Sequence, residues 1–321
     1  MGLSFSNAGS ERFYPFTQTR RIEDIRIGIL TIREKWERLP APGNIDPRQL
    51  AGVIDQAEKK QLDNSTDLVK LNDWALRQDF AMITKGRSSA AISSTNKTMN
   101  SFDIFIEEGA TIEHSILNAT DGPIYIGRNA TVMEGSMLRG PLAVCENAVI
   151  KMGSKIYGAT TIGPYCTAGG EIKNSILMGY SNKAHDGYLG DSVLGEWCNL
   201  GAGTSNSNIK NTAGNIKMKL KYVEVDAGMK FGLLMGDYSR AAINTSFNTG
   251  SVVGVCCNVF SSGLTEKFIP DFSWGSKGEK YLLEKAFTDI DNWKKFKGQS
   301  ITEKEKKTLT DICNSQSSKA I

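Results

Sequence analysis

The chain has 321 residues, enough for two domains, and its 40% hydrophobic and 23% charged content is ordinary for a globular protein. A formal net charge of +3 is too small to argue for nucleic acid or a membrane surface as a partner. The N-terminal peptide lacks the apolar core of a signal peptide, and no apolar run approaches the ~18 residues of a membrane-spanning helix. We therefore expect a cytoplasmic protein.

The six cysteines show no C-x-x-C pairing and have no histidine cluster nearby. Structural zinc needs closely spaced thiol and imidazole ligands. We therefore expect reduced, mostly buried thiols and no metal site.

Residues 1 to about 38 are expected to form a strand or loop followed by a helix. Apolar residues recur from Ile22 to Trp36 at the three- to four-residue spacing of a helix face. Arg20 follows a threonine-rich turn, where guanidinium and backbone donors suit a nucleotide phosphate. The alternative is a helix start with its arginines in solvent.

Residues 39–50 hold three of the eight prolines and predict a linker or a bend. From about Leu50 to Lys85 the pattern again favours a helix with one apolar face. A small, polar stretch begins at Lys85-Gly86-Arg87. We place the end of a first domain there, at residues 1–87.

From Ile106 onward an aliphatic residue recurs at every sixth position over long stretches. The positions are Ile106 and Ile112; Ile126, Val132, Leu138, Val144, Ile150, Ile156, Ile162 and Ala168; Leu194 and Leu200; and Met235, Ala241, Phe247, Val253 and Val259. Neither a helix nor an ordinary strand repeats at six, but the hexapeptide repeat of a parallel β-helix does. Three hexads form one triangular coil, and stacked coils bury the aliphatic residues as a continuous column. We expect residues 88–267 to form this β-helix, wound left-handed against the usual crossover rule.

The repeat is interrupted at about residues 205–230, where a projecting loop can reach a neighbouring subunit or cover a site. Apolar spacing over about residues 280–296 predicts a helix, and Ser300-Ile-Thr-Glu303 is a capping box for another. We expect residues 268–321 to cap the open end of the β-helix and protect its last strand.

The stretch 171–208 combines a rare base with a dense motif. His185 is one of two histidines in the chain, and Tyr188 follows it by three residues. Leu189-Gly190-Asp191 comes next, then Asn199-Leu200-Gly201-Ala202-Gly203-Thr204 and finally Asn208, while Glu171-Ile172-Lys173 precedes the histidine. This block resembles the acetyltransferase half of the bifunctional bacterial enzyme that acetylates glucosamine-1-phosphate and then uridylylates it. The detailed resemblance covers residues 171–208, and a looser repeat match covers about 104–263.

The resemblance implies an acetyl-CoA-dependent N-acetyltransferase that acts on an amino-sugar 1-phosphate in sugar-nucleotide (UDP-N-acetylglucosamine) biosynthesis. It also implies a homotrimer with the coenzyme between subunits. His185 is then the general base, because imidazole titrates near neutral pH. The other expected residues are Glu171, which polarises the base or the amine; Lys173 and, as a second candidate, Lys155 for the sugar phosphate; Tyr188 and Asn208 for the sugar; Asn199 for the histidine region or acetyl group; and Ala202, Gly203 and Asn244 for the coenzyme.

The N-terminal peptide F-Y-P-F-T-Q-T-R with D-I-R-I-G-I-L-T-I-R-E-K-W is similar to the start of sugar-nucleotidyltransferase-like proteins that carry this β-helix. Their Rossmann-like domain is much longer than residues 1–87, and only Thr19-Arg20 corresponds to its phosphate loop. Either the domain is degenerate or stretches of it are absent from the sequence. The expected fold is therefore mixed: an incomplete N-terminal α/β part, a left-handed parallel β-helix and C-terminal helices.

Two further functions stay open. The N-terminal part can carry sugar-1-phosphate nucleotidylyl transfer, with Mg²⁺ as its metal and the β-helix as a trimerising scaffold. Alternatively, the β-helix is a non-catalytic assembly module. A complete phosphate loop and metal-binding aspartates would support nucleotidylyl transfer, and neither is visible in the sequence. The set of His185, Tyr188 and Asn208 argues against the non-catalytic module.

Overall fold

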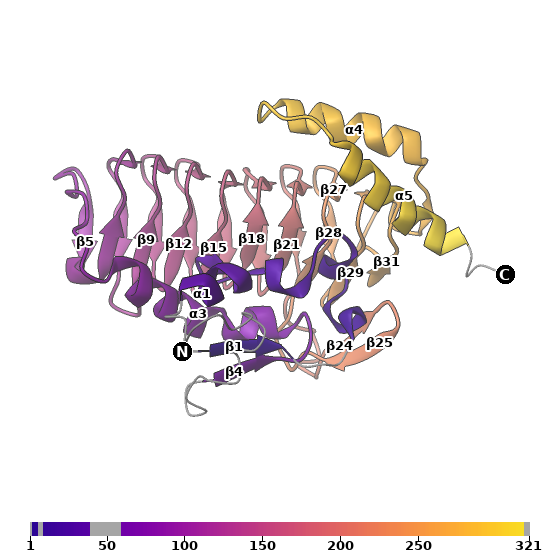
Figure 1. Ribbon diagram of the computed structural model, residues 1–321, viewed down its shortest axis with the longest axis horizontal. Helices are drawn as coiled ribbons and strands as arrows, with labels where there is room; N and C mark the ends of the chain where they lie inside the picture. The colour runs from indigo at the N-terminus through magenta and orange to yellow at the C-terminus, as the bar shows by residue number, and fades with distance from the viewer. Residues whose placement is uncertain (1, 6–8, 39–58, 318–321) are drawn as a thin grey trace.

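An elongated parallel β-helix runs the length of the molecule (Figure 1). The structure is a computed structural model, and it describes residues 2–5, 9–38 and 59–317. The N-terminal segment lies along one side of the β-helix, and two C-terminal helices lie on another side near its far end (Figure 1). The predicted combination of a parallel β-helix with an N-terminal α/β part and C-terminal helices is confirmed.

Three sheets form the walls of the β-helix within the described residues, and their strands are parallel except for the last one, β33. The six-stranded sheet consists of β5 (Lys97–Met99), β8 (Ile116–Asn118), β11 (Met137–Arg139), β14 (Lys155–Tyr157), β17 (Glu171–Lys173) and β20 (Tyr188–Gly190). The nine-stranded sheet consists of β6 (Ile104–Ile106), β9 (Ile124–Ile126), β12 (Leu142–Val144), β15 (Thr160–Ile162), β18 (Ile176–Gly179), β21 (Val193–Glu196), β26 (Leu233–Met235), β29 (Ser251–Val253) and β31 (Phe268–Ile269). The ten-stranded sheet consists of β7 (Thr111–Ile112), β10 (Thr131–Val132), β13 (Val149–Ile150), β16 (Thr167–Ala168), β19 (Asn182–Lys183), β22 (Asn199–Leu200), β27 (Arg240–Ala241), β30 (Asn258–Val259), β32 (Ser273–Trp274) and β33 (Glu279–Lys280).

The hexad residues form the core of the β-helix, as predicted. Every aliphatic position in the hexad series is buried, and all of them belong to one hydrophobic cluster. The parallel register explains the cluster, because Val132 pairs with Ile150 and Ile150 pairs with Ala168, one coil above the other. All six cysteines are buried free thiols, also as expected.

The N-terminal segment does not form the helix expected from Ile22 to Trp36. A hairpin of β2 (Arg26–Ile27) and β3 (Leu30–Thr31) interrupts it at Gly28, whose φ is 72°, and α1 begins only at Ile32 and ends at Arg38. Short 3₁₀ turns precede the hairpin at Ser10–Phe13, Phe16–Gln18 and Ile22–Asp24. The apolar residues from Ile22 to Trp36 therefore pack on the core from a 3₁₀ turn, a hairpin and a short helix, and not from one continuous helix.

Side chains from a distant helix hold this hairpin in place. In α3 (Asp67–Thr84), the Asn72 amide oxygen accepts the Gly28 N–H at 2.7 Å. One Asp79 carboxylate oxygen accepts the N–H groups of Ile29 and Leu30 at 2.8 and 3.1 Å and also pairs with the Lys35 ammonium. Satisfying these buried backbone donors outweighs local helix propensity.

The helix expected over about residues 50–85 is confirmed only as α3, which begins at Asp67. Residues 59–62 form a strand instead, and residues 50–58 of that expectation lie outside the described residues. Before α3, β4 (Lys59–Leu62) pairs in parallel with β1 (Gly2–Phe5). The N-terminal residues share one hydrophobic cluster with the outer face of the nine-stranded sheet, including Ile176, Val193 and Val252.

The interruption of the repeat folds back on its own chain. β23 (Ser205–Asn206) pairs with β28 (Ser246–Phe247), and an antiparallel hairpin of β24 (Lys217–Leu220) and β25 (Val223–Asp226) follows. Met218 and Leu220 of the hairpin are buried in the N-terminal cluster. In this structure the segment therefore closes the N-terminal core of its own subunit.

The C-terminal helices α4 (Leu283–Lys295) and α5 (Glu303–Ser317) pack along a corner of the β-helix, with α4 lengthwise on it (Figure 1). Their apolar residues contact the turns at Trp197, Tyr238 and Cys256. The antiparallel strand β33 covers the outer edge of β32 at the end of the ten-stranded sheet.

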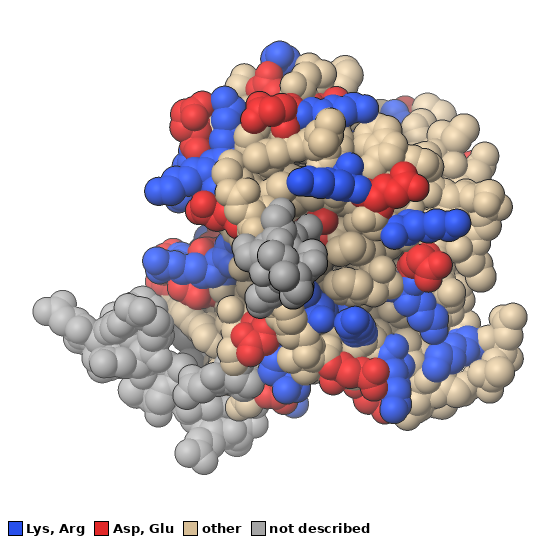
Figure 2. All heavy atoms as spheres, turned by 90° about the vertical axis from the view of Figure 1, so that its right-hand side faces the viewer, with Lys and Arg blue, Asp and Glu red and all other residues tan. Residues whose placement is uncertain are grey.

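The capping box of α5 lies two residues beyond the predicted one. The Glu305 carboxylate accepts the Thr302 N–H at 2.7 Å, and the Thr302 hydroxyl accepts the Glu305 N–H at 3.2 Å. Lys294 reaches the same carboxylate at 2.6 Å, which ties α4 to α5. On the face at this end of the molecule, lysines and arginines are interspersed with acidic residues (Figure 2).

We expect Asp79→Ala to lower the free energy of unfolding by about 3–5 kcal/mol, because it leaves the Lys35 ammonium buried without a counter-charge. Denaturant unfolding measures the change. Asp73→Ala on the same helix is the matched control, since it breaks only an exposed pair with Arg77 and should cost about 0.5 kcal/mol or less. Equal costs in the two variants would contradict the role given to Asp79.

Candidate functional site

His185 lies in the turn between β19 and β20, at one corner of the β-helix, and its side chain is exposed. The turns of the next two coils stack directly on it. The Gly203 N–H donates to the Asp186 carbonyl at 3.0 Å, and the Asn244 N–H donates to the Ala202 carbonyl at 2.7 Å. The structure therefore brings His185 and the three residues expected to contact a coenzyme into one corner column.

Glycines allow the coils to stack tightly at this corner. A Cβ on Gly187 would lie 2.1 Å from the Thr204 carbonyl oxygen, and a Cβ on Gly170 would lie 2.7 Å from the His185 carbonyl oxygen. Both glycines also have positive φ, which other residues rarely adopt. The local sequence around His185 thus sets how closely its turn sits against its neighbours.

The sheet face that follows the corner carries the expected sugar-phosphate residues. Parallel register aligns Lys155 with Glu171, and Glu171 with Tyr188, on consecutive strands of the six-stranded sheet. Tyr157 joins them, because its hydroxyl donates to Glu171 at 2.7 Å and its ring centroid lies 5.7 Å from the Lys173 ammonium. Sequence reasoning missed Tyr157, and the one available signal was its place two residues after Lys155 on the same strand face.

Tyr188 and Asn208, both expected to hold the sugar, are hydrogen-bonded to each other. The Asn208 amide donates to the Tyr188 hydroxyl at 3.1 Å and to Asp191 at 2.5 Å, and the other Asp191 oxygen accepts the Asn174 amide at 2.6 Å. Burial, with the nearby Asp191 carboxylate, raises the pKa of Tyr188 to about 12. The phenol is therefore neutral at physiological pH, and its own proton is available for an acceptor on a ligand.

A groove of about 470 Å³ runs along the six-stranded sheet from Glu171 toward the first coils, and Lys173, Tyr188 and Asn208 are not among the residues that line it. Its polar end includes Lys155 and Glu171, and its other lining residues are Met99, Ile116, Asn118, Met137, Leu138, Arg139, Ile156 and Tyr157. The volume is in the range of pockets for small organic ligands.

Asn199 lies on a different wall. It is on the ten-stranded sheet, aligned with Asn182 and Arg240 on the neighbouring strands, and Leu200 beside it points into the core. The structure thus places Asn199 before the corner and Tyr188 after it. A contact of Asn199 with the histidine region or an acetyl group stays a prediction.

Arg20 forms ion pairs with two carboxylates of the β-helix. Its guanidinium pairs with Glu196 at 3.1 Å and with Asp237, and it is mostly buried. Thr19 donates to the same Asp237 carboxylate at 2.6 Å. These bonds tie the N-terminal segment to turns of the β-helix. A phosphate contact by Arg20 stays a prediction, and it would have to displace one of these carboxylates.

Lys183 is a buried residue beside His185 that sequence reasoning missed. It aligns with the core residue Ala168, is 1% exposed, and lies on the inner side of β19. Its ammonium donates to the Gly169 carbonyl at 3.1 Å and to the His185 carbonyl. Burial lowers its pKa to about 8, although Asp186 acts in the opposite direction.

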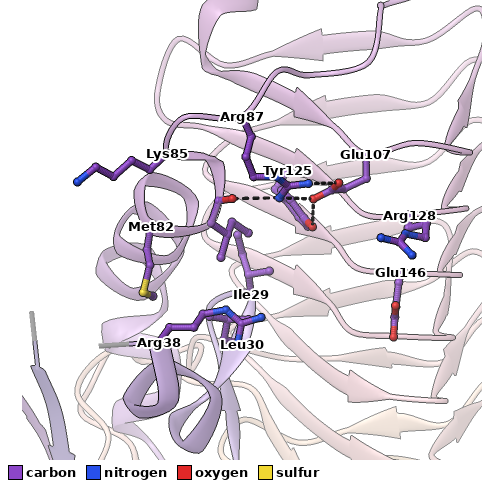
Figure 3. Close-up of a pocket in the computed structure, with 11 residues that line it drawn as sticks. Ile29, Leu30, Arg38, Met82, Lys85, Arg87, Glu107, Tyr125, Arg128 and Glu146 are labelled. Atoms are coloured by element: carbon purple, nitrogen blue, oxygen red, sulfur yellow. Dashed lines mark hydrogen bonds and ion pairs between the residues drawn. The ribbon is translucent and has the colours of Figure 1, made fainter. Parts of the chain in front are cut away.

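A separate cavity of about 630 Å³ lies between α3, the β2–β3 turn and the first coils (Figure 3). Arg87 forms a two-pronged ion pair with Glu107 at 2.9 and 2.6 Å, and the Tyr125 hydroxyl donates to the same carboxylate at 2.9 Å (Figure 3). None of the expected site residues lines this cavity.

Among the described residues, no group of three or more His, Cys, Asp or Glu side chains is placed to hold a metal ion. Nor does any helix in that part of the chain have the length and apolarity needed to cross a bilayer.

Comparison with known proteins gives two kinds of match. A family model described as sugar nucleotidyl transferase matches residues 3–45. The chain is also 30% identical over 146 residues to the bifunctional protein GlmU of Methanocaldococcus jannaschii, an overlap of 46% of this chain and 34% of that protein. It is 25% identical over 170 residues to the bifunctional sugar-1-phosphate nucleotidylyltransferase/acetyltransferase of Sulfurisphaera tokodaii, covering 46% and 42% respectively.

The match thus spans about a third of the length of the M. jannaschii relative. A solved UDP-N-acetylglucosamine acyltransferase of Francisella novicida matches 70% of this chain and 90% of its own, at 14% identity and a TM-score of 0.21. The family model and the curated relatives confirm the resemblance to bifunctional sugar-nucleotide enzymes inferred from the sequence.

We expect the free energy of unfolding to depend on pH through Lys183. The unfolded chain binds more protons than the folded one between pH 8 and 10.5, so this lysine makes stability rise with pH across that window. The contribution is at most about 3 kcal/mol. Denaturant unfolding of wild type and Lys183→Met at several pH values isolates it. A stability difference between the two proteins that stays constant from pH 8 to 10.5 would contradict the assignment.

Proposed function

We propose that the chain transfers an acyl group from a coenzyme A thioester to the amine of an amino-sugar phosphate, with His185 as the general base. The observation that carries this proposal is the corner itself. An exposed imidazole stands where the Ala202–Gly203 turn stacks beside it, and the wall carrying Glu171, Lys173 and Tyr188 begins next to it. The bifunctional relatives support the same chemistry.

The residues suit the steps of amide formation. The amine nitrogen attacks the thioester carbonyl, and His185 takes the proton that the nitrogen must lose. Negative charge then develops on the thioester oxygen, which needs a nearby donor. In the described part of the chain the Ala202 N–H makes no hydrogen bond, so it is free to serve, whereas the Gly203 N–H is used by Asp186. The coenzyme leaves as a thiol after accepting a proton.

The acceptor is held on the six-stranded sheet. Lys173 supplies a positive charge for the sugar phosphate, and the neutral Tyr188 phenol, oriented by Asn208, donates to a sugar oxygen. The Glu171 carboxylate already accepts a hydrogen bond from the Tyr157 hydroxyl, which fixes its orientation. In that orientation it would accept a hydrogen bond near the amine of the acceptor. Gly203 lets the Asn244 side chain lie directly against its backbone, so Asn244 would line the path of the pantetheine arm of acetyl-CoA at this corner.

A homotrimer is part of the proposal. Met99, Ile116 and Met137 form a half-exposed apolar row on the six-stranded sheet, and neighbouring copies of the chain would cover it. Asn244 would then contact a coenzyme bound at the seam between two subunits.

Sugar-1-phosphate nucleotidylyl transfer is a second candidate, because the family model matches residues 3–45. It would need Mg²⁺ and a phosphate site. Against it, the Arg20 guanidinium is already neutralised by Glu196 and Asp237.

We expect His185→Asn to lower turnover by roughly 10²- to 10⁴-fold, the usual worth of a general base. The measurement is release of the coenzyme A thiol with acetyl-CoA and a panel of amino-sugar phosphates. His114→Asn is the matched control, because His114 is exposed at the same corner several coils away. Undiminished turnover in His185→Asn would sink the assignment of the base.

If wild type releases no thiol with any amino-sugar phosphate, the acyltransferase proposal fails. A parallel assay of pyrophosphate release with nucleoside triphosphates and sugar 1-phosphates then tests the second candidate.

We expect Lys173→Met to raise KM for a phosphorylated acceptor with little change in kcat, because a binding charge is lost. KM for the same amino sugar without its phosphate should be unchanged. Steady-state kinetics with both acceptors makes the comparison, and Lys155→Met tests the second candidate in the same way. A loss that is equal for the two acceptors would show that Lys173 does not bind the phosphate.

A further inference from the structure

At the corner between the ten-stranded and the six-stranded sheets, side-chain hydroxyls repeatedly donate to buried backbone carbonyls. Ser115, Ser136 and Ser154 each directly precede a strand of the six-stranded sheet, and all three are buried. Their hydroxyls donate to carbonyls that directly follow strands of the ten-stranded sheet: Ser115 donates to Met133 at 3.2 Å, and Ser136 donates to Lys151 at 3.1 Å.

The same arrangement returns after the motif. Thr204 and Thr245 are buried at the corresponding turn positions, and both hydroxyls donate to the Ala242 carbonyl, at 3.0 and 2.8 Å. Buried carbonyls of this kind need a donor, because leaving one unpaired inside a dry core costs the full desolvation of the group.

No hydroxyl side chain directly precedes the strand of the six-stranded sheet in the coil that holds His185 or in the coil before it. Gly170 directly precedes β17 and Gly187 directly precedes β20, so neither turn has a side-chain donor at this position. A serine cannot replace them without rearrangement, because their Cβ atoms would lie within 3 Å of backbone atoms of the next coil. The close approach of the His185 turn thus excludes a hydroxyl donor at these two positions. The Ser154 hydroxyl of the preceding coil donates to the Lys151 carbonyl and leaves the Gly169 carbonyl to another donor.

Lys183 provides a donor at this corner from inside the β-helix. Its position on β19 belongs to the buried aliphatic column, between Ala168 and Leu200, yet it is a lysine. Its ammonium donates to the Gly169 carbonyl, which directly follows β16 and corresponds to those of Met133 and Lys151, and also to the His185 carbonyl itself. Asp186 is the charged group that acts on it.

We infer that Lys183 is a positioning residue that fixes the backbone of the His185 turn from inside the β-helix. This inference rests on the proposed function for its effect on turnover, but its effect on His185 is independent of that function. A lysine is long enough to reach two carbonyls from the core, and an ammonium has three N–H groups to donate. Without them the turn loses the bonds that set the direction of the imidazole.

Lys183→Met tests the inference, because methionine keeps the length and the apolar contacts and loses only the donors. The first readout is the side-chain NMR spectrum of histidine, since the protein contains only His114 and His185. We expect the His185 signals to shift or broaden and the His114 signals to stay. The second readout is steady-state kinetics, where kcat should fall by on the order of 10²-fold with KM nearly unchanged, as for a misplaced catalytic group.

Ser136→Ala is the matched control. It removes a corner donor of the same kind in a coil away from His185 and should cost stability without moving the His185 signals or kcat. If Lys183→Met does not fold, Lys183→Leu replaces it, because leucine is the residue at this position in the next coil. Unchanged His185 signals in the folded variant would overturn the inference, even if the wild type proves to have no acyltransferase activity. A kcat that falls equally in Ser136→Ala would overturn it as well.

Discussion

The stacked column of aliphatic side chains inside the β-helix is the interaction on which the rest of the structure depends. Each coil is too small to bury its own apolar face, so it gains stability only by stacking on its neighbours. The stacking also carries a cost, because it shuts corner carbonyls away from water and obliges the chain to provide a donor for each. Serine and threonine hydroxyls do this at several corner carbonyls, and Lys183 does it beside His185. The change of donor thus falls at the turn of the residue that we propose as the general base.

The three outer walls of the β-helix differ in how much of their surface other parts of the chain cover. The N-terminal segment and the β24–β25 hairpin pack on the nine-stranded wall, and α4 and α5 pack on a corner. The six-stranded wall keeps half-exposed apolar residues and the groove beside Lys155 and Glu171. The proposed site therefore lies on the wall that α4, α5 and the β24–β25 hairpin leave uncovered in the described structure, where a ligand can reach it.

The β-helix could be predicted from the sequence, because its buried residues recur at a fixed short spacing. A period of six is a property of the coil, so Ile126 through Ala168 could be placed in the core without any knowledge of the rest. Prediction from the sequence failed where a residue far away in the chain determines the local conformation. The hairpin at Gly28 exists because Asn72 and Asp79 accept its backbone donors, and the charge on Arg20 is taken up by Asp237.

The sequence by itself thus determined the parallel β-helix and its buried column, since the period specifies them, while a shared role of His185, Tyr188 and Asn208 stays a prediction from the local motif. Only the tertiary structure decided that Asn199 stands on another wall, that Tyr157 bonds Glu171, and that Lys183 reaches the carbonyl of His185 from the core. The reason is physical. Contacts between coils join residues about one coil apart, and irregular turn lengths around the motif hide which of them meet until the coils are stacked.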